Sequence, residues 1–80
     1  MTAQDFLELR QALSAAILEN NTEPLKKALS INDGGAFIIV RGVTVRIWRG
    51  SQWRIEAGSR HITITPETID EKIGVIREAI

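Results

Sequence analysis

Apolar and polar residues alternate along residues 36–65 of this 80-residue chain, and glycines interrupt the alternation. A period of two indicates β-strands with one buried face, and turn residues between such runs connect strands into an antiparallel meander. All apolar residues must reach the same face, so the number of residues in each turn is constrained. The pattern therefore predicts a four-stranded antiparallel β-meander over about residues 36–65.

The first two turns illustrate the constraint. A two-residue turn at Arg41-Gly42 places Ile38 beside Val45, although a continuous strand with a kink at the glycine also fits the pattern. The next turn needs an odd number of residues to keep the apolar sets together. A three-residue loop over residues 48–50, with its glycine in the left-handed position of a G1 bulge, sets Val45 opposite Trp53.

The third turn needs an even number of residues. Gly58-Ser59 supplies two, with glycine first as a type II′ turn prefers, and pairs Ile55 with Ile62. The same register puts His61, the only histidine, opposite Glu56. These two residues could begin a metal site or an acid/base pair, but no third ligand or activated nucleophile accompanies them. We therefore favour a cross-strand pair of little energy, and predict no catalytic residue, metal or cofactor.

Helical periodicity flanks the strands on both sides. A first helix runs from a cap at Thr2 to Asn20-Asn21, and a short second helix opens at residues 22–24 and ends at residues 32–35. A last helix is capped by Thr65, with a proline at its first position. The inward-facing positions are Phe6, Leu9, Leu13, Ala16, Ile17, Leu25, Ala28, Leu29, Ile69, Ile73, Ile76 and Ile80.

The expected fold is accordingly a single α+β domain spanning residues 1–80, with all three helices packed on one face of the meander. Apolar residues make up 44% of the chain and charged residues 25%, which is typical of a globular domain. The chain has no cysteine, no basic leader and no apolar run long enough to span a bilayer. These features exclude a disulfide framework and favour a cytoplasmic protein without a membrane partner.

Charge is distributed unevenly, although the net charge is zero. Residues 1–35 hold three basic and five acidic groups, residues 36–65 hold five arginines and one acid, and residues 66–80 hold two basic and four acidic groups. The predicted sheet is thus the only basic segment. Its arginines are Arg41, Arg46, Arg49, Arg54 and Arg60.

The second face of the sheet is mostly polar, as one face of an antiparallel sheet often is. Phe37, Ile39 and Trp48 depart from this pattern, and three large apolar residues on a solvated face suggest a contact surface. Either an intermolecular contact covers them, or the second helix or neighbouring arginine stems do.

Arg46 and Arg54 are expected to lie near each other on neighbouring strands, with Trp48 and Phe37 beside them. Like charges on adjacent strands repel unless an anionic ligand approaches or the guanidinium groups stack on aromatic rings. Arginine also suits a solvated strand position, and this ordinary explanation is the one we favour over a phosphate or carboxylate site.

Leu7 and Leu18 fall outside the apolar stripe of the first helix and share a second face of it. Another helix of the same chain is the favoured neighbour, ahead of a subunit contact.

The leading functional hypothesis is a non-enzymatic, self-associating protein-interaction module that uses the outer sheet face. Its expected partner is a second copy in a homo-oligomer or another protein. The interaction surface would comprise Phe37, Ile39, Arg46, Trp48, Arg54, Leu7 and Leu18. The alternative is nucleic-acid binding by the arginine-rich face with Trp48 as a stacking platform. A small enzyme or an enzyme inhibitor is the third hypothesis, for which the sequence offers no catalytic constellation.

Overall fold

The structure is a computed structural model that describes residues 3–31 and 34–80. Its strands form one antiparallel sheet in the order β1-β2-β3-β4, so the predicted α+β fold with a meander is confirmed. The expected helix cap at Thr2 and the expected turn residues Asn32 and Asp33 lie outside the described residues. The elements are α1 (Ala3–Leu18), α2 (Glu23–Ile31), β1 (Gly35–Val40), β2 (Val43–Arg49), β3 (Trp53–Ala57), β4 (Arg60–Ile64) and α3 (Ile69–Glu78).

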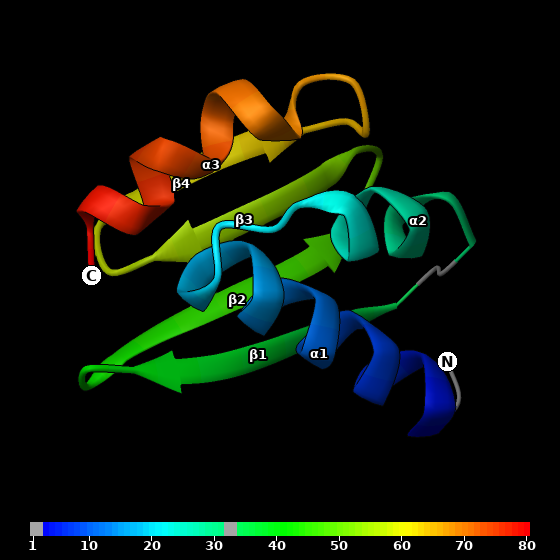
Figure 1. Ribbon diagram of the computed structural model, residues 1–80, viewed down its shortest axis with the longest axis horizontal. Coiled ribbons are helices and arrows are strands. Elements are labelled where there is room, and N and C mark those ends of the chain that lie inside the picture. The colour runs from blue at the N-terminus through cyan, green and yellow to red at the C-terminus, as the bar shows by residue number, and fades with distance from the viewer. Residues whose placement is uncertain (1–2, 32–33) are drawn as a thin grey trace.

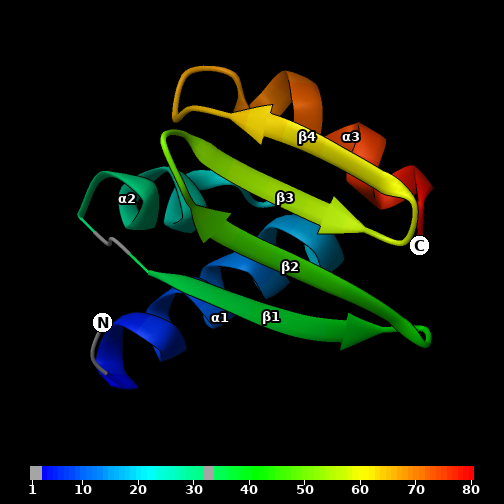
Figure 2. The same ribbon diagram turned by 180° about the vertical axis from the view of Figure 1, so that it is seen from behind.

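The helices all lie on one side of the sheet (Figure 1). Seen from behind, the strands stand in front of every helix, so no described helix covers the outer face (Figure 2). The short helix α2 packs against α1 in the helical layer. The alternative that α2 covers the outer face is therefore wrong, and none of the described helices lies over this face.

Two of the three turns have the predicted form. Val40 pairs with Val43 across Arg41-Gly42, which sets Ile38 opposite Val45 and rules out a continuous kinked strand. Both turn residues have positive φ, 52° for the arginine and 79° for the glycine, as a type I′ turn requires. Gly58 has φ 60° and Ser59 does not share the left-handed region, which is the type II′ pattern.

The loop between β2 and β3 differs from the prediction. It comprises residues 50–52, so Val45 lies opposite Ala57 and Ile47 opposite Ile55. Gly50 begins this loop without a positive φ, so the expected G1 bulge there is wrong. The two registers differ by four residues and keep the same side chains on the buried face. The observed one extends β2 to Arg49, which pairs with Trp53.

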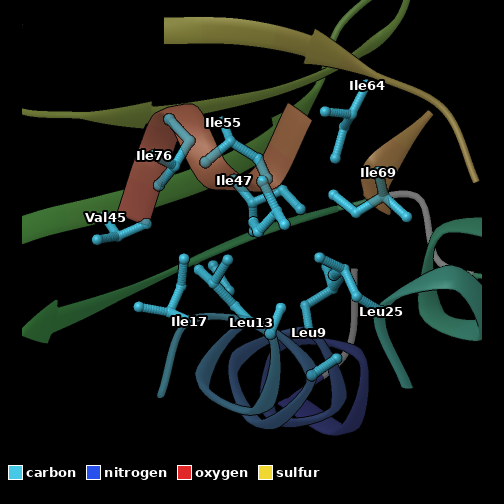
Figure 3. Packing of buried hydrophobic residues seen from close by; sticks show 14 of the residues in the cluster. Leu9, Leu13, Ile17, Leu25, Val45, Ile47, Ile55, Ile64, Ile69 and Ile76 are labelled. Carbon is cyan, nitrogen blue, oxygen red and sulfur yellow. The ribbon is translucent and has the colours of Figure 1, made fainter. Parts of the chain in front are cut away.

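The core lies between the sheet and the helices as one cluster. Figure 3 shows Leu9, Leu13 and Ile17 of α1 pointing toward side chains from β2 and α3. The predicted stripes of α1, α2 and α3 are confirmed, with Phe6 and Ile80 partly buried at the margins. The residues with almost no exposure are Leu9, Leu13, Leu25, Val45, Ile47, Ile55, Ile64, Ile69 and Ile76.

The last helix begins later than predicted, at Ile69. Thr65 instead opens a turn in which its N–H donates to Oγ1 of Thr68 at 3.0 Å. The carbonyl of Thr65 accepts from the N–H of Ile69 at 3.1 Å, so this turn leads directly into the helix. The threonine thus begins a separate turn and is not the helix cap.

Candidate functional site

The outer face of β2 carries an arginine stacked on an aromatic ring. Cζ of Arg46 lies 5.4 Å from the centroid of the Trp48 ring, which is a cation–π geometry. Nη1 of the same arginine is 3.7 Å from Oε2 of Glu56, its cross-strand neighbour. The guanidinium group of Arg46 therefore has two partners on this face, the Trp48 ring and the Glu56 carboxylate.

Arg54 of β3 completes what we call the aromatic–arginine cluster, namely Arg46, Trp48 and Arg54. It lies opposite Trp48, so it stands diagonally from Arg46 and the two arginines occupy one face as predicted. Its Nη2 is 3.4 Å from Nδ1 of His61. A guanidinium has no acceptor, so the imidazole nitrogen accepts.

His61 does lie opposite Glu56 in the register, as predicted. Their nearest polar partners are nevertheless arginines, Arg54 for the imidazole and Arg46 for the carboxylate. Each potentially reactive group on this face is thus engaged with a neighbouring cation. Among residues 3–31 and 34–80, no group of three His, Cys, Asp or Glu residues is arranged to hold a metal ion.

Apolar side chains gather where the outer face meets the free edge of β1. Phe37 is 49% exposed and Ile39 is 66% exposed. The phenylalanine ring touches Phe6 of α1 edge-on, with centroids 6.3 Å apart and planes at 72°. This contact leaves half of the Phe37 surface open and connects the outer face with the first helix.

Leu7 and Leu18 are 46% and 61% exposed, so the expectation that another helix of the chain covers them is wrong. The helix α2 packs on a different side of α1, near Ala12. Both leucines instead border a groove of about 490 Å³, whose opposite wall includes Ile39. The two surfaces predicted separately therefore meet, and we name Leu7, Leu18, Phe37 and Ile39 the β1 edge patch.

Sequence reasoning missed two surface features. Ile31 is exposed at the end of α2, away from the patch. A polar network joins α2 to α3, in which the buried Thr22 hydroxyl donates to Oδ1 of Asp70. Nζ of Lys26 lies 2.6 Å from Oδ2 of that aspartate. Nothing local signals this network, because 48 residues separate the threonine from the aspartate.

Replacing Asp70 with asparagine is expected to lower thermal stability slightly, and only over a defined pH range. The hydrogen bond from Lys26 holds the pKa of Asp70 below its ordinary value, and the hydrogen bond from Thr22 adds to the effect. This stabilisation is present above the unfolded pKa, about 3.9, and is lost as pH falls through the folded pKa. The same contact raises the pKa of Lys26, so its contribution is present below about 10.4 and lost at higher pH.

Thermal unfolding followed by circular dichroism checks this window. The variant and the parent protein should differ in Tm at pH 7 and coincide near pH 2. Added salt should reduce the difference at pH 7, because the Asp70 side chain is 60% exposed and the Lys26 side chain 27% exposed. Glu71→Gln, on the same exposed turn, is the control. A Tm difference that persists unchanged at pH 2 would contradict the assignment.

Comparisons with protein-family models, with curated proteins and with solved structures found no match to this chain. Within the described ranges, no helix has the length and hydrophobicity needed to cross a membrane. The functional argument therefore depends on the open sheet face, the aromatic–arginine cluster and the β1 edge patch.

Proposed function

We propose that this chain is a non-enzymatic protein-interaction module that associates with itself through the outer sheet face and the adjoining side of α1. The observation that carries the proposal is the β1 edge patch, four large apolar side chains that remain exposed, three of which, Leu7, Leu18 and Ile39, border one groove. Contiguous apolar surface of this kind is typical of an interaction site. A domain of this length also has a thin core, so a partner would add buried area that the fold lacks.

The polar groups of the outer face support a binding module. The side chains of Glu56 and His61 are each engaged with an arginine of the same face. Both side chains are accessible to solvent, since His61 is exposed and the Glu56 side chain is 38% exposed. Paired groups on a flat, wet surface provide complementarity to a partner, whereas catalysis relies on preorganised groups in a closed site.

Concentration-dependent light scattering tests the proposal. The chain should have more than the 8.9 kDa monomer mass at micromolar concentration, and Phe37→Glu should weaken association at least tenfold. A charge on this residue must lose its hydration when the patch is covered. Ile31→Glu is the control, because it puts the same charge on another exposed apolar residue outside the patch. A strict monomer, or equal effects of the two variants, would refute self-association through this surface.

Single-stranded nucleic acid is the second candidate, favoured by the aromatic–arginine cluster. Trp48 provides a ring for base stacking, and Arg46 and Arg54 provide guanidinium forks for phosphate on an uncovered face. Glu56 beside Arg46 and the acidic flanking segments oppose this function.

Binding of labelled oligo(dT) and oligo(U), measured by fluorescence anisotropy, tests this candidate. If it holds, affinity should be micromolar at low salt, fall as salt rises, and be lost in the double variant Arg46→Glu/Arg54→Glu. Lys27→Glu/Arg77→Glu makes the same charge change on the helices and serves as the control. No binding at low salt would eliminate this candidate.

A further inference from the structure

The two outer strands of the sheet differ in how their edges are protected. On β4, Nζ of Lys72 donates to the carbonyl of Thr63 at 3.0 Å. The strand also carries Arg60, so charge and a covering lysine both oppose the addition of another strand. Natural proteins commonly block sheet edges by these means.

The residues of β1 itself provide no protection of this kind. Its sequence, GAFIIV, contains neither a charge nor a proline. Val40 and Val43 close a two-residue turn, so they form a hydrogen-bonded pair, and alternate residues of β1 bond to β2 from there. Phe37 and Ile39 are the intervening residues, so their N–H and C=O groups face the free edge. An exposed, uncharged and apolar strand edge is a template for another strand.

The helix α1 lies beside this edge, and the residues on its exposed face have a symmetrical spacing. Four residues along one face of α1 are separated by four, three and four positions, namely Leu7, Gln11, Ser14 and Leu18. This spacing is the same when the helix direction is reversed. All of them border the groove that also includes Ile38 at the middle of β1. In both views the N-terminal end of α1 extends past β1, above the position of an added strand (Figures 1 and 2).

We propose that β1 pairs in antiparallel fashion with β1 of a second copy, giving one continuous sheet of twice the four strands. This inference rests on the proposed function and specifies its geometry. A two-fold axis at Ile38 places Phe37 opposite the partner's Ile39, and the symmetry repeats that pair. The same axis passes between Gln11 and Ser14, so Leu7 meets the partner's Leu18. The strand pair and the helix pair therefore both centre on residues that border one groove.

A second copy fits this edge for a physical reason. The pairing sets Phe37 opposite Ile39 on the strand and Leu7 opposite Leu18 on the helix, and it brings no like charges of β1 together. The polar residues Gln11 and Ser14 lie between the leucines of the helix. The free N–H and C=O groups of each strand satisfy those of the other. A two-fold interface of this kind is self-complementary without any further segment.

Engineered cysteines test the register, because the natural chain has none. Phe37→Cys and Ile39→Cys are prepared separately, checked for the parental circular dichroism spectrum, and oxidised alone or as an equimolar mixture. Paired residues on adjacent strands lie within disulfide reach, whereas residues offset by two positions lie beyond it. The mixture should form at least fivefold more covalent dimer than either variant alone. In the parent protein, the amides of Phe37 and Ile39 should exchange more slowly with deuterium as concentration rises.

The outcomes separate this inference from the proposed function. Preferential mixed crosslinking with amide protection, and a dimer mass unchanged by Trp48→Glu, supports edge pairing. A dimer that Trp48→Glu dissociates, without preferential crosslinking or protection, overturns edge pairing and leaves association through the outer face. A parent protein that stays monomeric, without crosslinking, overturns both.

Discussion

Replacing Ile47 with alanine is expected to destabilise the fold by about 2–5 kcal/mol, the usual loss for truncating a buried isoleucine. The side chain is 1% exposed and lies on β2 between Ala36 of β1 and Ile55 of β3. Its removal leaves a cavity under the strand that carries the aromatic–arginine cluster. A domain of this size has a free energy of unfolding of about 4–12 kcal/mol, so this substitution is expected to remove a large part of the stability.

Urea unfolding followed by fluorescence and circular dichroism measures this loss. Thr44→Ala is the matched control, since it truncates an exposed side chain on the same strand and should change stability by less than about 0.5 kcal/mol. Similar midpoints for both variants would contradict the placement of Ile47 in the core. The urea dependence of the free energy should remain the same if the variant unfolds in one step.

Replacing Trp53 with phenylalanine is expected to cost about 1–3 kcal/mol, because it leaves a buried acceptor without its donor. Nε1 of the indole donates to the carbonyl of Leu29 at 3.1 Å, and the ring is almost completely buried. Leu29 lies in the last turn of α2, where carbonyl groups have no partner within the helix. The indole thus joins the sheet to the end of α2.

Amide exchange of α2, together with the urea midpoint, measures this effect. Trp53→Phe should accelerate exchange in α2 more than in β2, since the helix loses its tie to the sheet. Trp48→Phe provides the control, because this residue is on the outer face and has no part in that contact. Equal destabilisation by the two substitutions would show that the hydrogen bond to Leu29 contributes little.

Much of the sheet follows from the sequence, and the exception has a clear cause. Turn length fixed which side chains share a face, and Ile55 does pair with Ile62. The β2–β3 register was wrong by four residues, since a slide by an even number preserves the buried face. A two-residue turn with left-handed residues leaves no such freedom, whereas a longer loop does.

The sequence predicts which residues belong to the outer sheet face, but it does not predict how this face is arranged relative to the first helix. The alternating pattern placed Phe37, Ile39, Arg46, Trp48 and Arg54 on one face. The exposure of Leu7 and Leu18 depends on which side of α1 receives α2, and helical periodicity contains no information on that choice. The link between Thr22 and Asp70 depends on tertiary contact in the same way.

The covered carbonyl of Thr63 limits how far any assembly of this chain can grow. A molecule with two open sheet edges can add strands without end and form a fibre. Here Lys72 occupies a backbone acceptor on the β4 side, so only the β1 side remains receptive. Pairing through β1 leaves neither molecule with a free β1 edge. If the proposed β1 pairing forms, the assembly should therefore end at two subunits rather than grow into a polymer.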